Sequence, residues 1–323
     1  MSAREKAALR DRSVKIGDGT QAKQMGEEGE NIRVHMCYSL TKSHMEEVHV
    51  TDEHTAESFA LFTINPGDIY IGDAGYGKGK NLEYIVSHQA DALLRVSPNH
   101  IQLSEDPCGK HKIQMAEKLS TKKDVIDFSC YVHTENGKRI PTRIVASRLP
   151  EDKAVEAVKR KKRNASKKQR RIKKETLLFA QWIILMTSLG EEFSASGILE
   201  LYRVRWQVEL LFKRIKQFFK ITRLKAATLQ HSLAYVLVLL IIWALTEREV
   251  TAAEMCLLAK QADLSRYSPW TMHGFFFHRL KATINALLVL YFDCDYLHIY
   301  RRLRNHNSSR PNQFAAFRFG HAC

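Results

Sequence analysis

Residues 199–220 read LELYRVRWQVELLFKRIKQFFK, and this stretch organises the rest of the chain. It contains no Gly or Pro, and at about 100° per residue its side chains separate into two faces of a helix. One face is apolar, and the polar face beside it carries one acid, Glu209, in a row of cations. Taken alone, this pattern is typical of a surface helix with ion pairs from Arg205 to Glu209 and from Glu209 to Lys213. The apolar face suits docking on a core and consists of Leu201, Val204, Val208, Leu211, Phe212, Ile215 and Phe219.

Two further carboxylates follow strand-like segments earlier in the chain. Asp18 follows SVKIG (13–17), and Asp73 ends DIYIGD (68–73). Each acid alone is more typical of a turn or of a strand-end cap. Together with Glu209, however, they predict an all-oxygen site of the kind that Mg²⁺ or Mn²⁺ prefers. Two such ions about 4 Å apart can hold the attacking and leaving oxygens of a phosphoryl transfer.

The positive charge of the chain is concentrated in one segment. The net charge is +15, and eleven cations with no acid lie between Lys159 and Lys174, so the rest of the chain carries +4. Like charges at this density repel one another, which favours a polyanion partner over a solvated helix. The cations expected to bind DNA there are Lys159, Arg160, Lys161, Lys162, Arg163, Lys167, Lys168, Arg170 and Arg171.

The remaining composition narrows the class of protein. Six scattered cysteines with no C-x-x-C pair argue against a zinc module and a disulfide framework, and indicate a reducing cytosol. The first residues, MSAREKAALRDRS, have no apolar segment of a signal peptide. The longest apolar run, 233–245, is too short to span a bilayer and suits a buried helix. We therefore expect a cytoplasmic protein with no membrane partner.

Local patterns predict an α/β protein. Strands are expected at 31–40, 44–53, 68–73 and 92–97, and helices at 56–62 and 81–89. Residues 101–149 contain short strand-like runs with a hairpin turn at Glu135-Asn136-Gly137, followed by a long basic helix or helical arm over 151–180. A buried strand at 181–189 precedes the helix of Glu209, which Ser194 or Ser196 is expected to cap. The C-terminal third is predicted to be helical, with a basic tail.

These motifs together resemble the DDE transposases of bacterial insertion sequences, in the group with a Tyr-x2-Arg-x3-Glu-x6-Lys signature. The signature residues here are Tyr202, Arg205, Glu209 and Lys216, within LYRVRWQVELLFKRIKQ. The first acid lies in IGDGT and is followed by RVHMCYSL and VTDEHTAES; the second lies in IGDAGYG. The resemblance covers roughly residues 13 to 250.

The resemblance implies a ribonuclease-H-like mixed sheet with flanking helices, a β-rich insertion and a helical C-terminal part. It divides the chain into an N-terminal remnant (1–12), a first catalytic part (13–100), the insertion with its basic arm (101–180), a second catalytic part (181–225) and a helical region with a basic tail (226–323). It implies that Asp18, Asp73 and Glu209 bind two Mg²⁺ or Mn²⁺ ions. Tyr202, Arg205, Lys213 and Lys216 would then contact DNA phosphates.

Trp182 opens the strand before the helix, where some family members stack a tryptophan on a flipped base; a buried strand-edge tryptophan is the alternative. The implied activity is cleavage at the ends of an element and transfer of the 3′-OH into double-stranded target DNA, by a homodimer or larger assembly associated with the nucleoid.

The chain departs from the family at its start, because only 17 residues precede Asp18, where family members usually carry a helical domain that recognises the element's ends. We therefore also consider that the chain is encoded by a truncated element. Two other hypotheses stay open: a catalytically inactive DNA-binding remnant, and a nuclease of the same fold that hydrolyses DNA without strand transfer.

Overall fold

The computed structural model describes residues 1–24, 32–42, 44–206, 223–224, 236–238, 241 and 245. Its contacts divide the chain into Met1–Val236 and Leu237–Cys323, and the fold described below belongs to the first unit. The predicted helical region 226–323 lies almost wholly outside the described residues. Within the described ranges, no helix combines the length and the apolar content needed to cross a bilayer.

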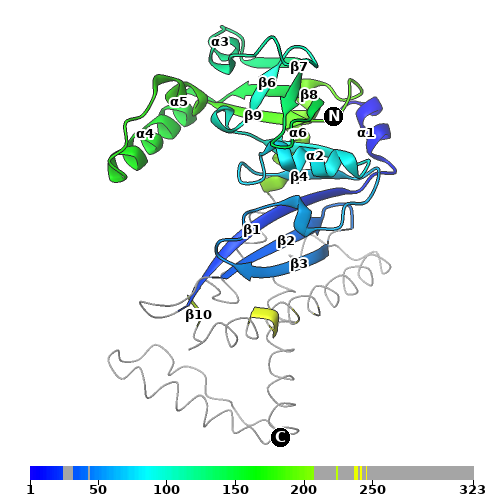
Figure 1. Ribbon diagram of the computed structural model, residues 1–323. Helices are drawn as coiled ribbons and strands as arrows, with labels where there is room; N and C mark the ends of the chain where they lie inside the picture. Colours follow the sequence, from blue (N-terminus) through cyan, green and yellow to red (C-terminus); the bar gives the residue numbers. More distant parts are fainter. Residues whose placement is uncertain are drawn as a thin grey trace, which may run out of the picture. The chain divides into compact units, whose positions relative to one another are not determined.

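The first half of the unit forms a mixed sheet in the order β3-β2-β1-β4-β5 (Figure 1). Its strands are β1 (Val14–Gln24), β2 (Ile32–Ser39), β3 (His44–Asp52), β4 (Ile69–Gly72) and β5 (Asp91–Arg95). β1, β2 and β3 are antiparallel neighbours, whereas β1, β4 and β5 run parallel. All four residues of β4 are buried, as expected for a central parallel strand covered on both faces. This order confirms the predicted ribonuclease-H-like sheet.

The predicted β-rich insertion continues the same sheet. Strand β9 (Trp182–Thr187) pairs antiparallel with β5 on one side and with β8 (Arg139–Arg148) on the other. Next to β8 follow β7 (Val125–His133) and β6 (Gln102–Ser104). The predicted turn between β7 and β8 is confirmed, with Gly137 at a φ of +76° that favours glycine.

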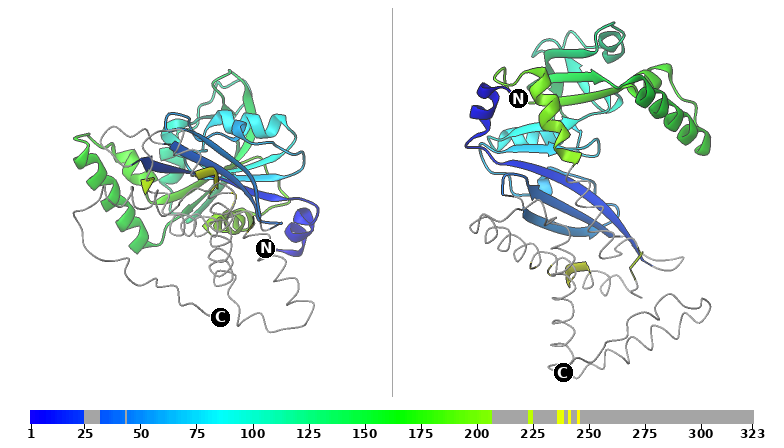
Figure 2. Two further views of the ribbon diagram at one scale, coloured as in Figure 1. Left: turned by 90° about the horizontal axis from the view of Figure 1, so that it is seen from below. Right: turned by 180° about the vertical axis from the view of Figure 1, so that it is seen from behind.

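Helices lie on both faces of the sheet. Figures 1 and 2 show α2 and α6 on opposite faces, so each face is covered near β4. Leu82 and Ile85 of α2 join Tyr70 and Leu94 in the larger buried apolar cluster. The helices are α1 (Ala3–Leu9), α2 (Gly79–Ser87), α3 (Met115–Leu119), α4 (Glu151–Lys167), α5 (Lys174–Phe179) and α6 (Ala195–Arg203), with single 3₁₀ turns η1 (Phe59–Leu61) and η2 (Pro98–His100). A short strand, β10 (Arg223–Leu224), pairs with the end of β1.

Two local predictions differ from the structure in detail. The basic helix or helical arm expected over 151–180 is two helices, because the chain leaves α4 at Lys168 and passes through Gln169 at a φ of +50° before α5 begins. The helix expected at 56–62 is the 3₁₀ turn η1. Near the N-terminus, α1 begins with a capping box between Ser2 and Glu5.

Candidate active site

The first two predicted acids lie side by side where the pairing of the parallel strands β1 and β4 stops. Gly17 of β1 pairs with Gly72, the last residue of β4, and Asp18 and Asp73 are the residues that follow. Asp73 therefore follows its strand as predicted, whereas Asp18 lies within β1, because this strand does not end at Gly17 but continues to Gln24. Each carboxylate is fixed by a local backbone hydrogen bond. The N–H of Gly19 donates to Asp18 Oδ1 at 2.8 Å, and the N–H of Gly75 donates to Asp73 Oδ1 at 2.8 Å. The register therefore brings together two acids that are 55 residues apart in the sequence.

A third carboxylate, which the sequence analysis did not select, lies between these two turns. A Cβ added at Gly75 would overlap Glu57 Oε2 and would lie 3.1 Å from Asp73 Oδ1. A Cβ added at Gly19 would lie 2.8 Å from Glu57 Oε1. Neither glycine has a positive φ, so the need for glycine here is space and not backbone strain. Glu57 therefore fills the gap between the residues that follow Asp18 and Asp73.

Glu57 is held in place from both sides of its segment. Asp52 accepts hydrogen bonds from the N–H and the hydroxyl of Thr55, and Arg33 donates to the Thr55 carbonyl at 2.9 Å. On the other side, the Phe59 N–H donates to the side chain of Asn81 at 3.0 Å. The segment between these anchors is short, so the position of Glu57 is well defined.

The charges around Glu57 shift the pKa of its carboxyl in opposite directions. Burial raises the pKa of the Glu57 carboxyl, and the neighbouring charge of Asp73 raises it further. Arg33 and Lys78 lower the same pKa, although Glu57 forms no ion pair or hydrogen bond with any described residue. A signal in the sequence could have pointed to Glu57, because it belongs to the VTDEHTAES segment and a glycine follows close behind each of Asp18 and Asp73.

Tyr76 adds a buried polar group to the same place. Its side chain is fully buried, and its hydroxyl has no hydrogen-bond partner among the described residues. Burial raises the pKa of Tyr76, and the charges of Glu57, Asp18 and Asp73 raise it further, in that order. The buried hydroxyl therefore lies within reach of the charges of all three acids.

Helix α6 brings two signature residues to Asp73. Ser194 caps the helix, as predicted, by accepting a hydrogen bond from the Gly197 N–H at 3.1 Å. Tyr202 is buried, and the guanidinium of Arg205 lies 5.4 Å from its ring centre. Burial raises the pKa of Tyr202; Arg205 and Arg95 lower it, and Asp73 raises it.

These effects indicate that Tyr202 lies near the charges of Arg205, Arg95 and Asp73. Glu209, Lys213 and Lys216 lie outside the described residues. Within the described ranges, no group of three or more His, Cys, Asp or Glu side chains is already arranged around a metal position.

Trp182 does not present a face for a base. It is only 2% exposed, belongs to the apolar core, and has the Arg148 guanidinium 5.1 Å from its ring centre. The placement matches the alternative of a buried strand-edge tryptophan.

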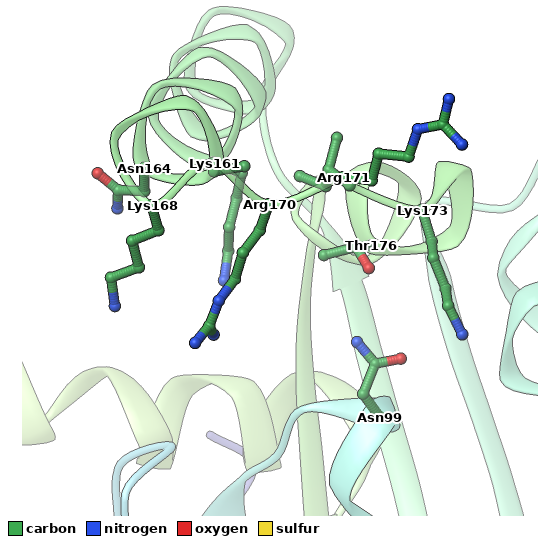
Figure 3. A pocket seen from close by; sticks show the side chains of 10 residues that line it. Asn99, Lys161, Asn164, Lys168, Arg170, Arg171, Lys173 and Thr176 are labelled. Carbon is green, nitrogen blue, oxygen red and sulfur yellow. The ribbon is translucent and has the colours of Figure 1, made fainter.

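The predicted basic residues form an exposed arm on α4 and on the turn before α5. Figures 1 and 2 show α4 standing out from the sheet. The nine predicted cations between Lys159 and Arg171 are exposed, and none has an ion pair in the part of the chain that is described. Between the arm and η2 lies a pocket of about 610 Å³ with Asn99 on its far side. Figure 3 shows Lys161, Lys168 and Arg170 pointing to the same side of it.

Comparisons with known proteins agree with this geometry. The family model described as "Transposase DDE domain" matches residues 10–245. A putative transposase InsL of insertion sequence element IS186A from Escherichia coli (strain K12) is 28% identical over 219 residues, which is 66% of this chain and 59% of that protein. The transposase of insertion sequence element IS421 from Escherichia coli matches to the same extent.

A more distant relative is the transposase of IS231C from Bacillus thuringiensis subsp. berliner. It is 24% identical over 185 residues, which is 53% of this chain and 39% of that protein. The alignments thus span about three fifths or less of the length of these relatives. The family model covers well over half of this chain and includes the strands that place Asp18 and Asp73 together with the start of the signature helix. The chain belongs to the family of the transposase DDE domain.

Proposed function

We propose that this protein is the transposase of a bacterial insertion sequence, which cleaves DNA at the ends of the element and joins the freed 3′-OH to target DNA. The observation that carries the proposal is the pairing of Gly17 with Gly72, after which Asp18 of β1 and Asp73 at the end of β4 follow on neighbouring parallel strands. The relatives named as transposases of insertion sequences support the same activity.

The residues at this position fit divalent cations. Asp18 and Asp73 offer oxygen ligands from a rigid sheet, and the unpartnered hydroxyl of Tyr76 lies beside them. We propose that Glu209 of the signature supplies the third carboxylate. Bound Mg²⁺ or Mn²⁺ would activate the attacking oxygen and stabilise the leaving oxygen of the phosphodiester.

The chain's own cations hold the DNA in this proposal. We propose that Arg205, whose guanidinium lies 5.4 Å from the ring centre of Tyr202, binds a phosphate that reaches the acids, and that Lys213 and Lys216 extend that contact. The exposed arm around Lys161 and Arg170 carries cations without acidic partners, so it suits the DNA backbone away from the cleaved bond. Because two element ends must meet, we propose at least a dimer, acting at the nucleoid.

The test is a strand-transfer assay. A labelled fragment that carries the ends of the element is incubated with supercoiled plasmid in Mg²⁺, using wild-type protein and Glu209→Gln. We expect labelled joined products with the wild type and none with the variant. Cleavage without joined products would instead indicate a nuclease, and salt-sensitive DNA binding with neither product would indicate a DNA-binding remnant.

A further inference from the structure

Glu57 has a position that the DDE signature does not explain. Its carboxylate occupies the space that Gly19 and Gly75 leave empty, next to the backbone that follows each catalytic Asp. Packing alone would not select a carboxylate at this position, because its charge is placed close to that of Asp73. Two like charges that share a site repel each other unless a cation lies between them.

Arg33 and Lys78 are close enough to Glu57 to lower its pKa, but no cation among the described residues is paired with its carboxylate. Glu57 forms no ion pair within the described ranges, and the guanidinium of Arg33 is committed to the Thr55 carbonyl. Buried polar groups in proteins normally have partners, and an unsatisfied one indicates a missing ligand, ion or water. The hydroxyl of Tyr76, fully buried and unpartnered among the described residues, is an independent sign of such a missing group at the same place.

We propose that Glu57 is a further carboxylate ligand of the divalent-cation site, in addition to Asp18, Asp73 and Glu209. The inference rests on the proposed function, and it assigns a ligand from outside the signature. Asp73 and Glu57 flank the same point at Gly75, so a side-chain rotation lets both reach one cation.

The first test measures metal binding directly. Metal-free protein is titrated with Mn²⁺ in a calorimeter, using wild type, Glu57→Gln, Asp73→Asn and the exposed control Glu117→Gln. Loss of a second-shell group already weakens a metal site by about tenfold, so removal of a ligand charge should weaken Mn²⁺ binding at least as much. We expect Glu57→Gln and Asp73→Asn to lose about tenfold or more in affinity, and Glu117→Gln to match the wild type.

Thermal unfolding separates a metal ligand from a structural residue. Since Glu57 has no hydrogen bond to lose among the residues that the structure describes, Glu57→Gln should fold, and its metal-free Tm should equal or exceed that of the wild type because repulsion with Asp73 is removed. Added Mn²⁺ should then raise the Tm of the variant less than that of the wild type. A structural role would instead lower the Tm with or without Mn²⁺.

The outcomes distinguish the two proposals. If wild type and Glu57→Gln bind Mn²⁺ equally while Asp73→Asn binds it weakly, Glu57 is not a ligand and the proposed function stands. If the wild type itself binds no Mn²⁺, both the metal site and the role of Glu57 are overturned. A Glu57→Asp variant that recovers part of the lost affinity would support direct ligation, because it restores the charge on a shorter side chain.

Discussion

Asn81 shows how a single side chain positions the candidate site. It is fully buried at the start of α2, and its amide oxygen accepts hydrogen bonds from the Phe59 N–H at 3.0 Å and the Ser58 hydroxyl at 3.1 Å. Its amide nitrogen donates to the Tyr76 carbonyl at 2.8 Å. One residue thus ties the segment of Glu57 to the loop that follows Asp73.

Removing this amide should destabilise the protein. Asn81→Ala leaves a buried N–H and a buried carbonyl without partners, and we expect the free energy of unfolding to fall by about 2–4 kcal/mol. Urea denaturation followed by circular dichroism measures the change. The exposed Asn99→Ala is the matched control and should stay within about 0.5 kcal/mol of the wild type. Equal stability of the two variants would show that the Asn81 network is not needed.

At the scale of elements, α1 is docked on the start of α6 through Glu5. Glu5 Oε1 accepts hydrogen bonds from the N–H and the hydroxyl of Ser194, at 2.9 and 2.6 Å, and Oε2 accepts one from the Ser2 N–H at 2.5 Å. A side chain at Gly197 would overlap Glu5, so the first turn of α6 leaves room for the acid. Because α6 carries Tyr202, this contact also helps to fix the signature residues relative to the sheet.

The same contact predicts a pH dependence. The hydrogen bonds from Ser194 and Ser2 lower the pKa of Glu5 from its ordinary 4.5 to about 2. A lowered folded-state pKa stabilises the fold above about pH 4.5, and the stabilisation is lost as the pH falls toward 2. Glu5→Gln should therefore have a lower urea midpoint than the wild type at pH 7, and the difference should shrink between pH 4.5 and pH 2. A difference that does not depend on pH would contradict this assignment; Glu117→Gln is the control.

The basic arm predicts a salt effect. Replacing Lys168, Arg170 and Arg171 by Gln removes three cations with no acidic partner in the described structure. DNA binding measured against salt concentration should lose about 0.9 in log–log slope for each lost phosphate contact, so about 2–3 in all. The same charge change at the exposed Lys110, Lys122 and Lys123, on other parts of the surface, should leave the slope unchanged. Equal slopes for the two triple variants would exclude the arm as the DNA contact.

At the scale of the whole molecule, the strand-and-acid pattern was enough to predict the sheet and its two acids. Asp18 and Asp73 each follow an apolar strand, and parallel strands end at one edge, so their meeting could be expected. The position of Glu57 could not be predicted in the same way, because only the folded structure brings its segment next to Gly19 and Gly75.

The join between the insertion and the core sheet was hidden for a similar reason. β9 pairs with β5 although the paired residues Arg95 and Leu185 are 90 positions apart in the sequence, and no local pattern encodes such a pairing. The break between α4 and α5 depends on one left-handed residue, Gln169, in a run of cations whose residue types all favour helix. The sequence pattern therefore could not predict the pairing of distant strands or the left-handed backbone of a single residue.

If Asp18 and Asp73 form one metal-dependent site that cuts DNA, either acid should be needed for cleavage. The nicking rate of supercoiled plasmid with Mn²⁺ tests this directly, comparing wild type, Asp18→Asn, Asp73→Asn and the exposed control Asp124→Asn. We expect metal-dependent nicking by the wild type and the control, and no nicking above the metal-free background by Asp18→Asn or Asp73→Asn, with all four proteins equally folded. Nicking by Asp18→Asn or Asp73→Asn at the wild-type rate would contradict it.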